Sequence, residues 1–226
     1  MIGFYDYTVW LTYLSFVSAS TGIYMTLAYD APVIGIICLL ISGLCDAFDG
    51  KVAATKKERT DREKKYGIQI DSLSDVVAFG VLPGIIGMAE FRKYIADNPF
   101  TMPKGRIFIS VFVFIITVVY MLAAYIRLAY YNVEEEERQN HETGRRFAYR
   151  GLPVTSVALI FPLLYIVQEF STEIFVTAYF AVMLIVSFAF LLDIPVKKPG
   201  LRGVIILTSI GLAEFGILIL FRYVLY

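Results

Sequence analysis

The segment CDAFDGKVAA at residues 45–54, followed by GIQIDSLSD at residues 67–75, places four aspartates at the edges of two apolar stretches. They are Asp46, Asp49, Asp71 and Asp75. The members of each pair are three or four residues apart, so each pair shares one face if its segment is helical. A charge in an apolar helix is costly without a partner. Two such faces turned toward each other would form a carboxylate cluster, whose hard oxygen ligands favour Mg²⁺ or Mn²⁺.

The rest of the chain is unusually apolar. Of its 226 residues 58% are hydrophobic, and the mean hydropathy is +0.68, which indicates several membrane spans rather than a soluble domain. Seven apolar stretches cover residues 8–29, 31–54, 70–91, 106–131, 152–168, 173–192 and 203–223. Backbone groups in lipid must be paired internally, which favours helices. We therefore predict an all-α, polytopic membrane bundle of about seven transmembrane helices (six to eight), forming one domain over residues 1–226.

The basic residues predict the orientation of this bundle. Fifteen of the twenty Lys and Arg residues fall in residues 51–65, 127–150 and 197–202, which seven spans would place on one side of the membrane together with the aspartates. The positive-inside rule makes that side cytoplasmic. We expect an integral protein of a prokaryotic plasma membrane with its active site facing the cytoplasm. The formal net charge of zero gives no reason to expect a nucleic-acid partner.

Small residues accompany the aspartates, and Gly50 and Ala53 allow a ligand to approach the helix backbone closely. The whole pattern resembles the signature of the CDP-alcohol phosphatidyltransferase family, Asp-x-x-Asp-Gly-x-x-Ala-Arg, a spacer, then Gly-x-x-x-Asp-x-x-x-Asp. The matching residues are Asp46, Asp49, Gly50, Ala53, Gly67, Asp71 and Asp75. The chain departs from the signature at Ala54, where the family has arginine, and the spacer from Ala54 to Gly67 is a few residues longer.

The resemblance implies transfer of a phosphatidyl group from CDP-diacylglycerol to an alcohol, with release of CMP. The implied ligands of two Mg²⁺ or Mn²⁺ ions are Asp46, Asp49, Asp71 and Asp75. Asp75, the last of the four, would also be the catalytic general base that takes the proton of the acceptor hydroxyl. The residues expected to bind the CDP-lipid are Gly50, Lys51, Ala53 and Gly67.

The spacer between the two aspartate pairs reads KKERTDREKK at residues 56–65. It is expected to form a solvated cytoplasmic loop, or to place its cations against anionic lipid headgroups. Lys56 or Lys57 could also supply the positive charge that is missing at Ala54.

A second informative segment is AYIRLAYYN at residues 124–132, where Arg127 lies inside an apolar run. Its guanidinium could snorkel to the interface, or it could bind a carboxylate or phosphate with two hydrogen bonds. This segment, with GLPVT at residues 151–155, is similar to the phosphatidylserine synthases of the family. The similarity implies L-serine as the acceptor substrate. The residues expected to bind serine or a phosphate are Arg127, Asn132 and Arg150.

Other interpretations remain open at this stage. A sister enzyme of the same family would use glycerol phosphate, inositol phosphate or another alcohol. A cation or metal transporter would explain the carboxylates but not the glycines and alanine at their spacing. The hydroxyls of LTYLSFVSA at residues 11–19 either pack helices together or contact a headgroup or nucleotide. We expect residues 134–137 to form a solvated acidic loop, and the protein to be a homodimer among membrane lipids.

Overall fold

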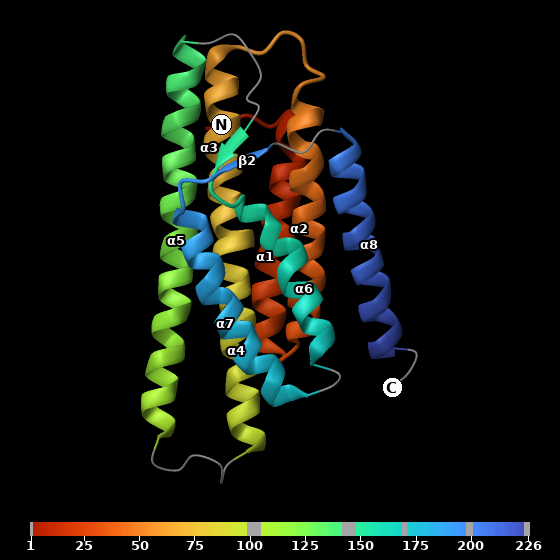
Figure 1. Ribbon diagram of the computed structural model, residues 1–226. Coiled ribbons are helices and arrows are strands. Elements are labelled where there is room, and N and C mark those ends of the chain that lie inside the picture. The colour runs from red at the N-terminus through yellow and green to blue at the C-terminus, as the bar shows by residue number, and fades with distance from the viewer. Residues whose placement is uncertain (1, 99–104, 142–147, 169–170, 198–200, 224–226) are drawn as a thin grey trace.

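The structure is a computed structural model that describes residues 2–98, 105–141, 148–168, 171–197 and 201–223. These residues form a bundle of helices lying roughly along one axis (Figure 1). The helices are α1 (Trp10–Ala28), α2 (Pro32–Ala53), α3 (Asp61–Asp75), α4 (Leu82–Asp97), α5 (Arg106–His141), α6 (Val157–Val167), α7 (Thr172–Leu191) and α8 (Leu201–Tyr223). Short 3₁₀ helices, Tyr7–Val9 and Val154–Ser156, precede α1 and α6. One antiparallel pair joins β1 (Ala148–Arg150) to β2 (Pro195–Lys197), with Tyr149 opposite Val196.

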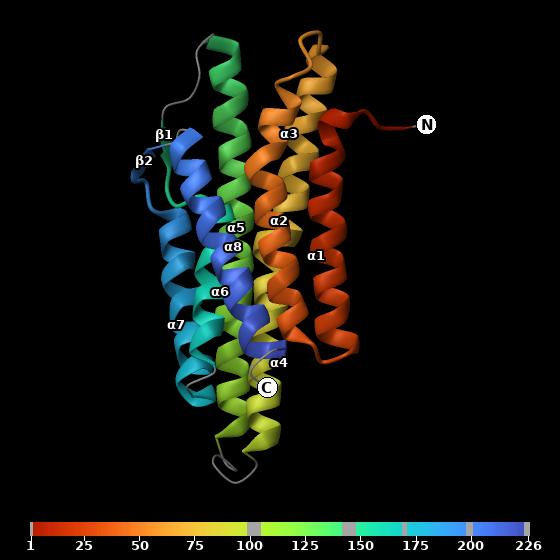
Figure 2. The same ribbon diagram turned by 90° about the vertical axis from the view of Figure 1, so that its right-hand side faces the viewer.

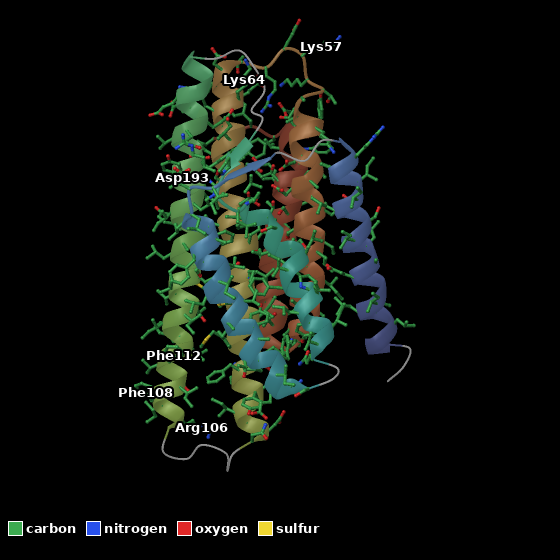
Figure 3. The ribbon with its side chains drawn as sticks, in the orientation of Figure 1. Lys57, Lys64, Arg106, Phe108, Phe112 and Asp193 are labelled. Carbon is green, nitrogen blue, oxygen red and sulfur yellow. The ribbon has the colours of Figure 1, made fainter. Side chains whose placement is uncertain are left out.

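The predicted helical membrane bundle is confirmed. Within the described residues, five helices are long and apolar enough to cross a membrane; they span Pro32–Ala53, Asp61–Asp97, Arg106–Glu137, Thr172–Leu191 and Arg202–Leu220. The other two predicted stretches form α1, with 19 residues, and the shorter α6, with 11 residues. Lys57 and Lys64 lie toward one end of the bundle and Arg106 at the other (Figure 3).

The charged spacer is helical over its second half, in contrast to the predicted loop. Helix α3 begins at Asp61 because Thr60 and Glu63 form a capping box. The Thr60 hydroxyl accepts from the Glu63 N–H at 3.2 Å, and the Glu63 carboxylate accepts from the Thr60 N–H at 2.7 Å. Helix α3 continues through the π-helical turn Val76–Val81 into α4, so that Asp61–Asp97 forms one continuous helix.

The prediction of a solvated loop at residues 134–137 is wrong, because α5 continues through them to His141. Glutamate is a good helix former, and cations from other elements lie beside this part of α5. The Lys65 ammonium on α3 is 3.3 Å from Glu136, and the Arg150 guanidinium is 3.3 Å from Glu134. Helix α5 therefore extends beyond its apolar part alongside α3.

Helices α1 and α2 form a closely packed antiparallel hairpin (Figure 2). The Ser18 hydroxyl donates to the Cys38 carbonyl at 3.0 Å, and the Ser42 hydroxyl donates to the Ser15 carbonyl at 3.1 Å. A Cβ at Gly22 would lie 2.8 Å from the Cys38 Cβ, so this position requires glycine for the close approach. The Ser18 hydroxyl of α1 thus serves helix packing, as one of the two interpretations predicted. The hairpin sets the end of α2 beside α1 and α3.

Candidate functional site

Three of the four aspartates come together between α2 and α3. Asp46 and Asp49 lie on the last turns of α2, and Asp71 lies on α3. One carboxylate oxygen from each lies within 4.8 Å of the other two, and all three side chains are half-buried. Like charges this close repel one another, and a divalent cation among them would remove the repulsion. The donor set, three hard carboxylate oxygens, fits Mg²⁺ or Mn²⁺.

Asp75 lies one helical turn beyond Asp71 on α3 and is not part of this close group of oxygens. Its side chain is buried, with 6% of its surface exposed. The adjacent Ser74 hydroxyl donates to the Thr12 carbonyl of α1 at 3.2 Å, which fixes this part of α3 against α1. The fourth aspartate is therefore more deeply enclosed than the other three.

Asp49 receives hydrogen bonds at both of its carboxylate oxygens. The Gly50 N–H donates to Oδ1, and the buried Thr12 hydroxyl approaches Oδ2 at 3.4 Å. These contacts orient the carboxylate toward Asp46 and Asp71. The sequence indicated a row of hydroxyls in the segment that forms α1. Only the packing of α1 on α2 identifies Thr12 as the residue whose hydroxyl reaches an aspartate.

The residues expected to bind the CDP-lipid lie beside the three aspartates. A Cβ at Gly50 would meet nothing within 4 Å, so open space adjoins the helix at Asp49. Ala53, at the end of α2, is half-buried. Lys51 is exposed, and its ammonium lies 4.8 Å from the centre of the Phe48 ring. At Gly67 on α3, an added Cβ would lie 2.8 Å from Nη2 of Arg59.

Lys56 does not replace the arginine that the family has at position 54. Its ammonium is 2.7 Å from the Asp6 carboxylate and 2.6 Å from the Glu63 carboxylate, so two anions already balance its charge. The hydrogen bond from Lys56 lowers the pKa of Asp6 to about 2. Lys57 is exposed at the outer end of the molecule (Figure 3).

Arg127 is buried inside the bundle, with 6% of its surface exposed, so the snorkelling interpretation is wrong. Its guanidinium lies 5.9 Å from the centre of the Tyr131 ring. A Cβ at Gly151 would come within 3.4 Å of its Nε, and the backbone φ of +74° at Gly151 also favours glycine. The segments that carry Arg127 and Gly151 are therefore in contact, although they are far apart in the sequence.

Asn132 and Arg150 occupy different surroundings. The Ser72 hydroxyl, next to Asp71, donates to Oδ1 of Asn132 at 2.8 Å, which places Asn132 against the helix that carries the aspartates. Arg150 is exposed, and its guanidinium lies 3.3 Å from Glu134 and 3.5 Å from Asp193. Those carboxylates balance much of its charge, so the geometry favours Asn132 over Arg150 as a neighbour of the site.

Comparison with known proteins agrees with this arrangement. The model of the CDP-alcohol phosphatidyltransferase family matches residues 8–192. A CDP-diacylglycerol–serine O-phosphatidyltransferase of Helicobacter pylori is 32% identical over 125 residues, which are 54% of this chain and 43% of that protein. The protein with the same description in Saccharomyces cerevisiae is 29% identical over 133 residues, 58% and 41% of the two chains. The one in Mycobacterium bovis is 24% identical over 191 residues, 83% and 59% of the two chains. The chain thus spans less than two thirds of the length of these relatives.

Proposed function

Because the chain belongs to the CDP-alcohol phosphatidyltransferase family, we propose that it transfers the phosphatidyl group of CDP-diacylglycerol to L-serine. The products would be phosphatidylserine and CMP. The observation that carries this proposal is the group of three carboxylates, within 4.8 Å of one another, between α2 and the continuous helix Asp61–Asp97. Such a centre would hold cations that offset the charge of a pyrophosphate substrate and the negative charge that develops on the leaving CMP as the P–O bond breaks.

Asp46, Asp49 and Asp71 would hold the divalent ions, with Asp75 as a further ligand if two ions bind. The ions, Mg²⁺ or Mn²⁺, would neutralise the pyrophosphate and the charge that develops in the transition state. Thr12 and the Gly50 N–H would keep the Asp49 carboxylate in position. The open space at Gly50 would admit the nucleotide.

Asp75 would act as the general base of the reaction. Its carboxylate would take the proton from the serine hydroxyl while the serine oxygen bonds to the lipid-linked phosphorus. The bond from that phosphorus to the bridging oxygen of the pyrophosphate would break, and CMP would leave with the bonding electrons. Burial of Asp75 supports this role, because it places the carboxylate where solvent is excluded.

Serine as the acceptor is supported by the names of the relatives and by the buried guanidinium of Arg127. Serine carries a carboxylate, and arginine holds a carboxylate with two parallel hydrogen bonds. The same guanidinium would suit the phosphate of glycerol phosphate or inositol phosphate, so a sister activity on one of these acceptors is the second candidate. Asn132 would line the same region, since Ser72 holds it beside Asp71.

The distribution of basic residues supports an active site on the cytoplasmic face of a prokaryotic plasma membrane. The homodimer stays a prediction.

The test is release of CMP from CDP-diacylglycerol by the purified full chain in lipid vesicles. L-serine, glycerol 3-phosphate and inositol phosphate are each supplied with Mg²⁺, with Mn²⁺ and with a chelator. We expect metal-dependent CMP release with L-serine. Release with another acceptor alone would assign the sister activity. No release with any acceptor and either metal would contradict the enzyme proposal and favour the transporter interpretation.

A further inference from the structure

The segment between α2 and α3 carries an arginine, Arg59, whose side chain lies close to the helix of Asp71. The family signature has its arginine at the end of the first aspartate helix, where this chain has the exposed Ala54. Five residues later, in the part of the spacer that is not helical, stands Arg59. Its side chain lies along the first turns of α3, which follows it in the chain.

One hydrogen bond and one close approach place the Arg59 guanidinium against α3. Nη2 donates to the Glu63 carbonyl at 3.3 Å, and the same atom lies 2.8 Å from where a Cβ at Gly67 would be. A methyl group at Gly67 would have to displace the end of the Arg59 side chain. Nε of Arg59 is buried and has no hydrogen-bond partner among the described residues. A guanidinium carries five N–H donors, and among the described residues the hydrogen bond from Nη2 to Glu63 is the only one that the Arg59 side chain donates.

The position of this guanidinium relates it to the aspartates. Gly67 precedes Asp71 by four residues, so the two lie on one face of α3, about 6 Å apart along the helix axis. Arg59 therefore lies roughly one helical turn from the nearest carboxylate of the group. It stands two residues before Asp61, the first residue of α3.

The charge of Lys56 is already balanced, and that of Arg59 is not. Lys56 lies against Asp6 and Glu63. The second oxygen of Glu63 accepts from Thr60, so Glu63 offers Arg59 only its backbone carbonyl. Among the described residues, Arg59 forms no ion pair with a carboxylate, and its positive charge is available to an external anion.

We propose that Arg59 binds a phosphate of the CDP group of the donor lipid and supplies the cation that is absent at Ala54. The inference rests on the proposed function, because it identifies the ligand as a cytidine diphosphate. A guanidinium binds phosphate oxygens with two directed hydrogen bonds. The longer spacer provides the chain length needed to bring Arg59 from the end of α2 to Gly67.

Binding of CDP and of cytidine to the full chain, measured calorimetrically with Mg²⁺, tests the inference. Arg59→Ala should weaken CDP binding about tenfold to a hundredfold, the size expected for a charge-assisted hydrogen bond, and leave cytidine binding unchanged. Arg59→Lys, which keeps the positive charge, should lose less of the affinity for CDP. The matched control is Arg62→Ala, which removes an exposed arginine three residues away and should change neither affinity. Adding Ala54→Arg to Arg59→Ala should restore CDP binding.

Gly67→Ala provides an independent test, because the new methyl group would displace the flexible end of Arg59. It should weaken CDP binding selectively, as Arg59→Ala does. In the Arg59→Ala background it should cause no further loss, which separates an effect through Arg59 from the direct contact with the CDP-lipid expected of Gly67. A purely structural role for Arg59 predicts instead equal losses for CDP and cytidine, a lower midpoint of thermal unfolding and no rescue by Ala54→Arg, and that result would overturn the inference.

Parental CDP affinity in Arg59→Ala would also overturn it, while CMP release by the parent would leave the proposed function intact. If the parent neither binds CDP nor releases CMP, the proposed function fails together with the inference.

Discussion

The Ser72 hydroxyl donates a hydrogen bond to Oδ1 of Asn132 across 2.8 Å and joins α3 to α5. Ser72 follows Asp71, and Asn132 lies five residues after Arg127. This contact therefore connects the helix that carries the proposed metal site to the helix that carries the proposed acceptor site. The ion pair between Lys65 and Glu136 joins the same two helices nearer the start of α3.

Removal of this hydrogen bond should affect use of the acceptor. We expect Ser72→Ala and Asn132→Ala each to raise the serine KM severalfold, because a hydrogen bond contributes about 1 kcal/mol. The double variant should be no worse than the more severe single variant, since both remove the same contact. Steady-state kinetics on the three variants measure this. Fully additive effects would show that the two side chains act independently.

The three grouped aspartates should each be required for turnover. We expect Asp46→Ala, Asp49→Ala and Asp71→Ala to lower CMP release about a thousandfold or more, because a metal ion contributes several kcal/mol to the transition state. The control is Asp61→Ala, which removes an exposed aspartate of α3 and should keep most of the activity. Titration with Mn²⁺ should show weaker metal binding in the three variants only. Near-parental CMP release from any two of them would remove the basis of the metal site.

The variant Asp75→Asn should show whether Asp75 acts as the general base or mainly as a metal ligand. The amide keeps the shape and one carbonyl oxygen but cannot accept the proton of the serine hydroxyl. We expect CDP-diacylglycerol to bind with nearly parental affinity and turnover to be almost abolished. Both quantities are measured on one preparation. A joint loss of binding and turnover would instead make Asp75 mainly a metal ligand.

The variant Arg127→Lys should show whether Arg127 binds the acceptor, serine, or the donor, CDP-diacylglycerol. Lysine keeps the positive charge but loses the paired hydrogen bonds of the guanidinium, so the KM for serine should rise more than the KM for CDP-diacylglycerol. Arg106→Lys, at the exposed opposite end of the same helix, is the matched control and should leave both KM values unchanged. A change confined to CDP-diacylglycerol would mean that Arg127 holds a phosphate of the donor.

The ion pair between Asp6 and Lys56 should make stability depend on pH in acid. The pKa of Asp6 falls from its ordinary value of 3.8 to about 2, chiefly through the hydrogen bond from Lys56. Because the folded state lowers this pKa, the stabilisation is complete above pH 4 and is lost as the pH falls toward 2. Asp6→Asn should therefore lower Tm slightly above pH 4 and have no effect near pH 2. A Tm difference that persists at pH 2 would show that the ion pair is not its source.

Much of this protein could be determined from the sequence because hydropathy and residue spacing are local properties. The apolar stretches predicted the helical membrane bundle, and the three- and four-residue spacings placed each aspartate pair on one face of a helix. The Asp–Gly–Ala pattern also carried the resemblance to the family that the comparison supports.

The tertiary structure decided which residues of these helices come into contact. Packing of α1, α2 and α3 brought Asp46, Asp49 and Asp71 together, left Asp75 a turn away, and set Thr12 against Asp49. It also buried Arg127 beside Gly151 and laid Arg59 on Gly67, where a lysine of the spacer had been the candidate cation. Such contacts join residues far apart in the chain, or depend on the direction of one long side chain. They follow from how neighbouring helices fill the space between them, which no local pattern of residues specifies.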